Sequence, residues 1–149
     1  MTLTRTELRN WLKLVGGIKA LLDALDRQLR TDAGMSHDDY QILSRLHRDP
    51  KQTMRMSDLA DEVGFSTSRL SHAVGRLEGR GWVRRIPSTT DRRVVEAVLT
   101  GAGSNRVREV SPDHLTQVKR LVFETLGPDR ARETAEAMDD IRRAARSDG

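Results

Sequence analysis

Residues 56–86, MSDLADEVGFSTSRLSHAVGRLEGRGWVRRI, contain the pattern that most clearly indicates the fold of this chain. Ser57 is a candidate N-cap for a short helix, and Gly64 is placed to end that helix. The apolar residues of this helix share one face: Leu59, Ala60 and Val63. Ser66 then offers an N-cap for a second helix only two residues later. The stretch therefore predicts two helices joined by a short turn.

The second predicted helix, residues 67–80, has one apolar and one polar face. The apolar face consists of Leu70, Ala73, Val74 and Leu77, and the polar face of Ser68, Arg69, Ser71, His72, Gly75 and Arg76. Gly81 stands where a glycine commonly ends a helix, and residues 82–86 alternate apolar with basic side chains, as an edge strand does. We expect Trp82 to pack beneath that strand.

A second strand is predicted to return from a turn. Residues 87–91, PSTTD, have turn chemistry, and residues 94–99, VVEAVL, are rich in β-branched side chains. The two strands predict a two-stranded hairpin that carries basic side chains. A helix, a short turn, a helix and a basic hairpin together indicate a winged helix-turn-helix, whose second helix fits a DNA major groove about 12 Å wide. The predicted fold class is mainly α with a small β-hairpin.

Further helices are predicted before this unit. Apolar residues between Leu8 and Leu29 recur at steps of three and four, which indicates a helix over about 4–31. At 1.5 Å per residue this helix is roughly 40 Å long, which is more than a small core needs. Part of its apolar stripe is therefore expected to pack on another chain. A helix over about 36–48, with Ser36 as N-cap, follows it.

After the hairpin, helical spacing resumes at Thr100. Pro112 is expected to kink this helix, and a last helix is predicted over about 128–146.

The composition narrows the classes of function. A length of 149 residues suits a single domain. The chain has no cysteine, which excludes disulfides, thiolate metal sites and thiol redox sensing. No apolar stretch approaches the roughly 18 residues that a membrane span needs, so we expect a cytoplasmic protein without a membrane partner.

Positive charge is concentrated in one segment of the chain. Residues 67–93 hold seven arginines but only two acidic residues, Glu78 and Asp91, and so carry a net charge of +5, whereas the whole chain carries +4. A face that binds a polyanion has this distribution. A solvated run of surface charge is the alternative, and the helical and hairpin patterns in the same segment argue against it.

The chain resembles the MarR family of bacterial transcriptional regulators. The resemblance rests on the MSDLADEVGFS run at 56–66, on Leu70 and Val74, and on three further motifs, which are RLE at 76–78, GWVRR at 81–85 and DRR at 91–93. It continues in LTGAG at 99–103 and reaches the flanking helices, so it covers nearly the whole chain.

This resemblance implies a homodimer that binds double-stranded DNA. Residues 1–149 would form a single MarR-type domain, with dimerisation helices at about 4–31 and 104–146 and a DNA-binding lobe at about 36–100. The amphipathic ends agree with it, because a two-fold dimer would bury their apolar stripes. A sequence-specific regulator of this kind, acting as a repressor, would be released from a pseudo-palindromic operator by a small molecule.

The DNA contacts are expected on the second helix of the lobe and on the wing. The resemblance implies that Arg93 enters the minor groove while Asp91 pairs with it to hold its direction. Arg92, Arg84 and Arg85 would contact phosphates, which sets affinity rather than sequence choice. The full set of expected DNA-binding residues is Ser57, Thr67, Ser68, Arg69, Ser71, His72, Arg76, Arg84, Arg85, Asp91, Arg92 and Arg93.

The resemblance also implies an effector site in the crevice between the dimer helices and the lobe, for a small aromatic or carboxylate ligand. The candidate residues are Trp11, Val15, Tyr40 and His47. The alternative for each is an ordinary core position, because aromatic residues on an apolar stripe are commonly packing residues.

No metal or cofactor is expected. The four histidines, at 37, 47, 72 and 114, are too far apart in sequence to form a pair within one helix. Two other functions are weighed: an architectural or activating DNA-binding protein without an effector, and a small hydrolase that uses carboxylates such as Asp58, Asp61 and Glu62. No nucleophile, metal motif or phosphate loop accompanies those carboxylates, so an enzyme is not expected.

Overall fold

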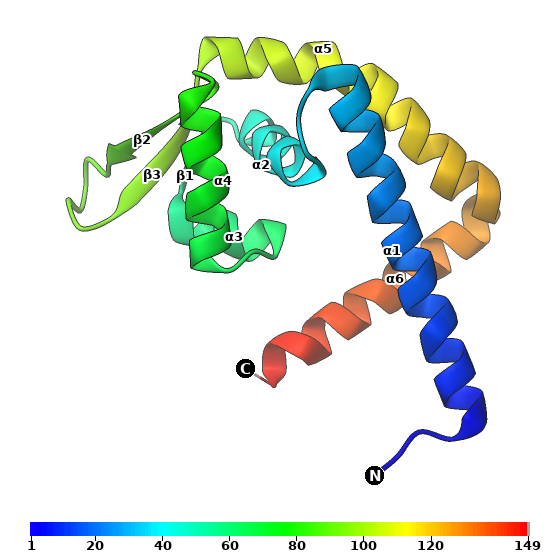
Figure 1. The fold of residues 1–149 in the computed structure, drawn as a ribbon. Coiled ribbons are helices and arrows are strands. Elements are labelled where there is room, and N and C mark those ends of the chain that lie inside the picture. Colours follow the sequence, from blue (N-terminus) through cyan, green and yellow to red (C-terminus); the bar gives the residue numbers. More distant parts are fainter. Residues whose placement is uncertain (149) are drawn as a thin grey trace. The chain divides into compact units, whose positions relative to one another are not determined.

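The computed structural model describes residues 1–148 and is mostly helical, with one small sheet (Figure 1). The chain divides into two compact units, residues 1–112 and the residues from 113 onward. The first unit contains α1 (Arg5–Ala33), α2 (His37–Arg48), β1 (Thr53–Arg55), α3 (Met56–Val63), α4 (Thr67–Gly79), β2 (Val83–Pro87), β3 (Val95–Leu99) and the start of α5 (Gly101–Val118). The first four helices, α1 to α4, match the predicted ones to within about two residues at each end.

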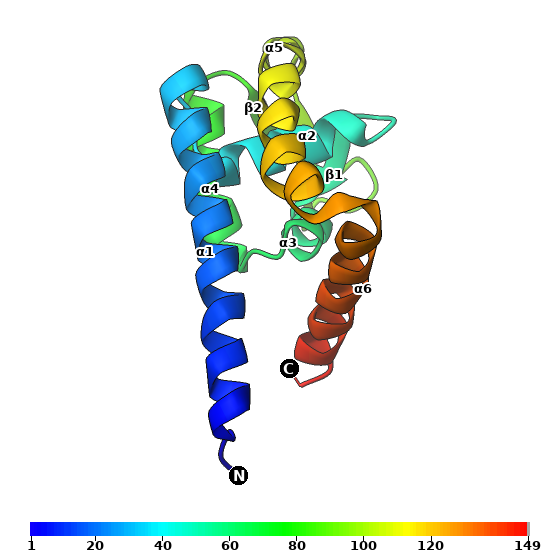
Figure 2. The same ribbon diagram turned by 90° about the vertical axis from the view of Figure 1, so that its right-hand side faces the viewer.

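The long helix α1 has well-defined ends and two very different halves. Thr4 and Glu7 form a capping box at its start, and Gly34 ends it in the left-handed conformation, with φ of 63°. Its C-terminal half is buried at Leu25, Leu29 and Ala33. Residues 1–20 are exposed throughout, and this half extends away from the rest of the first unit (Figure 2). The helix therefore has an N-terminal half without a packing partner inside its own unit.

The sheet has three strands rather than the predicted two. β3 lies in the middle, antiparallel to β2 and to β1, in the order β1-β3-β2. β1 pairs Thr53 with Val98 and Arg55 with Glu96. The sequence did not indicate β1 because three residues are too short to establish an alternating pattern. The hairpin of β2 and β3 is confirmed.

The predicted cap of α3 is wrong. Arg55 occupies the N-cap position, with extended backbone and no side-chain hydrogen bond, and Ser57 lies inside the helix with an exposed side chain. The helix starts early because β1 leads directly into it. By contrast, Ser36 accepts a hydrogen bond from the Asp39 backbone and Ser66 accepts one from the Arg69 backbone, as predicted. Gly64 ends α3 in the left-handed conformation.

The core of the first unit joins α2, α3, α4 and the sheet to the end of α1 and the start of α5. The predicted inner face of α4, from Leu70 to Leu77, is buried. The largest fully buried side chains are Leu29, Ile42, Leu43, Leu46, Leu59, Leu70, Leu77, Val74 and Val83. This core fixes α4 and the hairpin against each other, with the polar side of α4 turned outward.

The second unit contains the end of α5, a π-helical segment η1 (Lys119–Glu124) and α6 (Thr125–Ser147). α5 continues through Pro112. Gly127 interrupts the helical backbone with φ of 76° and ψ of 168°, directly before Pro128. The predicted start of the last helix at 128 coincides with this break. Among residues 1–148, no helix is both long and apolar enough to cross a membrane.

Candidate nucleic-acid interface

The polar face of α4 is the centre of the candidate interface. Thr67, Ser68 and His72 are exposed on it, and Ser71 is half-buried. Ser66 caps the helix and also lies 3.4 Å, oxygen to oxygen, from the hydroxyl of Ser68. Small polar side chains at the first turns of a helix allow its backbone to approach base edges closely.

Two arginines of α4 contact the start of α2 rather than extending freely. The Arg69 guanidinium donates to both carboxylate oxygens of Asp38, with its Nη2 at 2.7 and 2.8 Å, and lies 4.0 Å from the centre of the Phe65 ring. Arg76 Nη2 donates to Asp39 at 3.1 Å. The sequence predicted both arginines as DNA contacts but did not indicate these acidic partners. Contacts between separate helices leave no periodic signal in a sequence.

Arg85 is also held within the chain. Its Nε donates to Glu78 at 2.7 Å and its Nη1 donates to the Ser71 hydroxyl at 3.1 Å. The hydrogen bond from the Arg85 side chain is the main reason why the pKa of Glu78 lies below its usual value. Arg85 thus links the strand β2 to the polar face of α4, while the neighbouring Arg84 is exposed.

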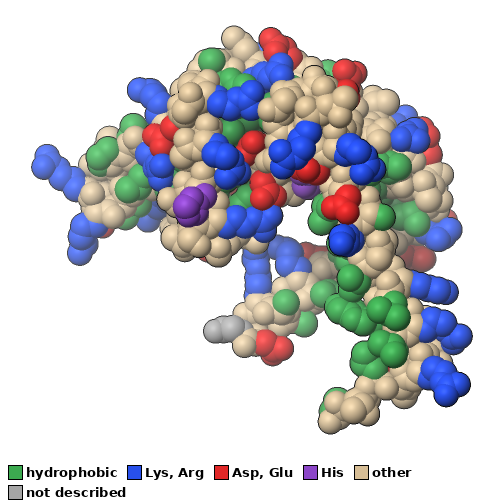
Figure 3. All heavy atoms as spheres, in the orientation of Figure 1, with side chains coloured by type: hydrophobic (Ala, Val, Ile, Leu, Met, Phe, Trp, Pro, Cys, Tyr) green, Lys and Arg blue, Asp and Glu red, His purple; other side chains and the backbone are tan. Residues whose placement is uncertain are grey.

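The wing between β2 and β3 carries the pair that the resemblance implies. Arg93 Nε lies 3.2 Å from an Asp91 carboxylate oxygen, and the Arg93 backbone N–H donates to the same oxygen at 3.0 Å. Hydrogen bonding from the Arg93 side chain holds the pKa of Asp91 below its usual value. The Arg93 side chain is nevertheless 91% exposed, and Arg92 beside it is exposed. Basic side chains project from the wing in Figure 3.

The four candidate effector residues occupy different environments. Trp11 and Val15 are exposed on the first half of α1. Tyr40 belongs to the core and its hydroxyl lies 3.0 Å from that of Ser111, while His47 is half-buried with Nδ1 3.3 Å from the Ser104 hydroxyl. Trp11 and Val15 thus lie on the exposed stripe of α1, whereas Tyr40 and His47 lie in or beside the core of the lobe. The effector crevice therefore stays a prediction.

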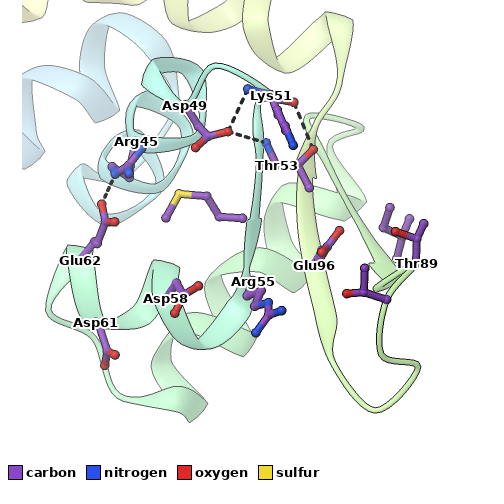
Figure 4. A pocket seen from close by; sticks show the side chains of 13 residues that line it. Arg45, Asp49, Lys51, Thr53, Arg55, Asp58, Asp61, Glu62, Thr89 and Glu96 are labelled. Carbon is purple, nitrogen blue, oxygen red and sulfur yellow. Dashed lines mark hydrogen bonds and ion pairs between the residues drawn. The ribbon is translucent and has the colours of Figure 1, made fainter.

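Two cavities of the first unit are lined by other residues. One, of about 770 Å³, lies between the end of α2, β1, α3 and the wing (Figure 4). Acidic and basic side chains both line it, and Arg45 forms an ion pair with Glu62 there. The other, of about 610 Å³, lies between α1, the start of α2 and α4, and its lining includes Asp38, Asp39, Arg69 and Arg76. The sequence predicted a crevice between the dimer helices and the lobe, and this second cavity lies between α1 and the lobe, but none of the four residues predicted for the crevice lines it. The first cavity was not predicted, because its lining comes from several separate elements.

No group of histidine and carboxylate side chains within residues 1–148 is arranged to hold a metal ion. The hydroxyl, amide and guanidinium groups of α4 and the wing can instead donate hydrogen bonds to phosphates and base edges.

Comparison with known proteins assigns this architecture to a family. The MarR family model matches residues 33–94. The structure is similar to that of Sco3205, a MarR family transcriptional regulator from Streptomyces coelicolor solved in complex with DNA, with 38% identity, a TM-score of 0.92 and coverage of 97% of this chain and 91% of that one. AbsC, a MarR family transcriptional regulator from the same organism, has 35% identity and a TM-score of 0.91, with 99% of both chains covered.

The transcriptional repressor MprA of Escherichia coli K12 is 29% identical over 92 residues, which are 62% of this chain and 52% of that protein. The winged helix-turn-helix and the two similarities that span almost the whole chain lead to one conclusion. This chain belongs to the MarR family of transcriptional regulators and is not an enzyme.

Proposed function

We propose that this regulator is a homodimeric, sequence-specific DNA-binding repressor that a small molecule releases from a pseudo-palindromic operator. The observation that carries the proposal is the combination of an exposed polar face on α4 with an exposed arginine, Arg93, whose direction Asp91 fixes at the tip of the wing. A helix for the major groove and a guanidinium for the adjacent minor groove are the two contacts that a winged helix-turn-helix needs. Such a regulator acts in the cytoplasm, where bacterial DNA lies.

The exposed half of α1 supports a dimer. Large apolar side chains on this half are between 39% and 62% exposed: Leu8, Trp11, Leu12, Leu14, Val15, Ile18 and Leu22. Part of this stripe is visible as green side chains along α1 in Figure 3. A second copy of the chain would cover this stripe in a two-fold interface. We therefore assign residues 4–31 and 104–146 to dimerisation and 36–100 to the DNA-binding lobe, within a single domain of 149 residues.

The expected DNA contacts fall into two groups. Thr67, Ser68, Ser71 and His72 face the base edges and determine sequence preference, whereas Arg84 and Arg92 contact phosphates and determine affinity. Arg69, Arg76 and Arg85 have carboxylate partners in the free chain, so they contribute to DNA binding by exchanging these partners for phosphates or by holding α4 in place. In the dimer, the two α4 helices would lie about 34 Å apart, one turn of DNA.

The similarity to the transcriptional repressor MprA supports the repressor assignment. The effector would act by a shift of population. A ligand that prefers dimers with wrongly spaced α4 helices lowers DNA affinity by its difference in binding energy between the two arrangements. A coupling of about 1–3 kcal/mol gives about a 5- to 150-fold change in affinity. Trp11, Val15, Tyr40 and His47 remain the residues expected around a small aromatic or carboxylate ligand.

Fluorescence anisotropy across a salt series tests the proposal. The purified dimer is titrated with a duplex obtained by in vitro selection and with a scrambled duplex of the same length and composition. Specific regulation predicts at least about a 10³-fold preference for the selected duplex and a steep fall of affinity with salt. Equal binding to both duplexes would contradict it and favour an architectural protein. If a broad ligand panel releases no DNA, the effector part of the proposal fails.

A further inference from the structure

Two arginines from different helices bind the carboxyl end of α1. Arg106 Nη2 donates to the Ala33 carbonyl and Arg80 Nη1 donates to the Gly34 carbonyl, each at 2.6 Å. The last carbonyls of a helix have no partners inside that helix and carry partial negative charge. Arg80 comes from the end of α4 and Arg106 from α5, so both helices are tied to the end of α1.

The same two arginines lie against one indole ring. The Arg80 guanidinium is 4.0 Å and the Arg106 guanidinium 5.8 Å from the centre of the Trp82 ring, both within the range of a cation–π contact. A planar guanidinium can stack on an aromatic face and donate a hydrogen bond in its plane at the same time, which an ammonium cannot do. We call Arg80, Trp82 and Arg106 the Trp82 joint.

The backbone of Trp82 is fixed from both sides. Its N–H donates to Leu77 of α4 at 3.0 Å, and its carbonyl accepts from the Thr100 backbone N–H, directly before α5, also at 3.0 Å. At Gly103, an added Cβ would lie only 2.2 Å from the Trp82 carbonyl oxygen, so α5 passes Trp82 at a distance that only glycine allows. The joint thus connects α1, α4, the start of β2 and α5 at a single point.

We infer that the Trp82 joint sets the orientation of the DNA-binding lobe on α1, and through it the half-site spacing that the regulator accepts. The inference rests on the proposed dimer, in which α1 belongs to the interface and α4 reads DNA. Leu29 and Ala33 of α1 pack in the core of the lobe, and a rotation of the lobe relative to α1 would in addition break both arginine–carbonyl hydrogen bonds. Arg80, Trp82 and Arg106 are therefore positioning residues, and none of them needs to touch DNA.

The operator spacing is the measurement that separates positioning from plain stabilisation. Inserting one base pair between half-sites moves one of them by about 3.4 Å and rotates it by about 35° around the duplex axis. A rigid lobe discriminates strongly between such duplexes, whereas a loosened lobe adapts to them. A residue that only stabilises the fold would change the melting temperature but leave the relative affinities for different spacings unaltered.

The experiment compares the full-length Arg80→Gln/Arg106→Gln variant with wild type on selected duplexes with the central spacer changed by −1, 0, +1 and +2 base pairs. The control is Arg48→Gln/Lys51→Gln, which removes the same charge from two exposed positions, at the end of α2 and in the turn that follows it, outside the joint and outside the segments assigned to dimerisation. Anisotropy gives the affinity for each duplex. We expect the preference of the joint variant for the original spacing to fall by about five- to tenfold, and that of the control to stay within about twofold of wild type.

A second variant, Trp82→Leu, keeps both arginines and removes only the ring, and it should flatten the spacing profile in the same direction. A joint variant that keeps the wild-type profile, with or without a lower melting temperature, overturns the inference while leaving the proposed function intact. A wild-type protein that shows no preference for two spaced half-sites contradicts the proposed dimeric repressor itself, and the role of the joint with it.

Discussion

The winged lobe and the first half of α1 use similar apolar side chains for opposite purposes. In the lobe, Ile42, Leu43 and Leu46 of α2 have no exposed surface. On α1, Trp11 is 54% and Leu12 62% exposed, although both lie in a regular helix with a strong cap. The lobe completes its core within one chain, whereas the first half of α1 leaves an apolar stripe exposed, which the proposed dimer would cover.

The charged residues show a similar contrast. In the lobe, Arg69, Arg76 and Arg85 are paired with carboxylates of their own chain, which fixes the surface around α4. At the wing, Arg93 has a partner only two residues away and remains almost fully exposed. The three paired arginines shape the surface around α4, whereas Arg93 extends from the wing.

The largest effect is expected on dimer dissociation, from a charge placed in the exposed apolar stripe of α1. Leu22→Asp would place two unpaired carboxylates in the proposed interface, and an uncompensated buried charge costs about 3–5 kcal/mol. The dimer should therefore dissociate at least about a hundredfold more readily, and light scattering after size exclusion would report a monomer. A variant that remains fully dimeric and stable would show that this stripe is not the interface.

The stability of the buried core of the lobe should depend on the volume of its side chains. Leu43→Ala removes a fully buried side chain, so the free energy of unfolding should fall by about 2–5 kcal/mol. Urea denaturation followed by circular dichroism measures this change. The same substitution at the exposed Leu12 should act mainly on dimer dissociation. The comparison is made at protein concentrations below the dissociation constant of the dimer. Equal losses of unfolding free energy at Leu43 and Leu12 would show that the two regions do not differ in this way.

Arg93→Ala tests the extended wing contact. Loss of the one guanidinium expected in the minor groove should weaken binding to every duplex and lower the slope of log affinity against log salt by about one. Asp91→Asn is the companion variant, because it keeps Arg93 but removes the carboxylate that directs it. If affinity and salt slope are unchanged in the Arg93 variant, the wing does not bind DNA in the proposed way.

His72→Ala should alter sequence preference with a smaller effect on overall affinity. His72 is exposed on α4 next to Ser71, and a lost contact with a base edge costs about 1–3 kcal/mol at the base pair concerned. In vitro selection with the variant should report a weaker base preference at one position in each half-site. An unchanged selected sequence would place His72 outside the base-reading surface.

The smallest effect is a pH dependence at the junction of α1 and α2. Burial lowers the pKa of His37 below its ordinary value of 6.5. The unfolded chain therefore binds a proton more readily than the folded chain, and stability falls as pH drops from about 7 through 6.5 toward the lower folded pKa. In the His37→Asn variant, the midpoint of urea denaturation should depend less on pH over this range. A variant that follows the wild-type curve would assign the dependence to other groups.

The sequence predicted what local patterns determine. The spacing of Leu70, Ala73, Val74 and Leu77 correctly gave the buried face of α4, and Ser66 correctly marked its start. β1 was missed because a strand of three residues depends on its pairing with β3, which no local pattern records. Ser57 is not the cap of α3, because β1 leads directly into the helix and places Arg55 at the N-cap, which the sequence pattern did not indicate.

The sequence allowed residues to be proposed for the candidate site, but it did not predict the contacts that they make. The acidic partners of Arg69 and Arg76 lie 31 and 37 positions earlier in the chain, and only the packing of α2 on α4 brings them together. Arg80, Trp82 and Arg106 likewise meet only because α4, β2 and α5 converge at the end of α1. Such contacts follow from tertiary packing, which single residues and their spacing do not encode.

Sedimentation equilibrium of the protein with a selected pseudo-palindromic duplex gives the number of chains bound to one duplex from the mass of the complex. We predict two chains on each duplex, even when duplex is in excess, because α1 joins the chains before α4 and the wing bind. A complex with one chain on each duplex would refute the proposed dimer. Binding of further chains as the protein concentration rises, whatever the duplex sequence, would refute sequence-specific binding.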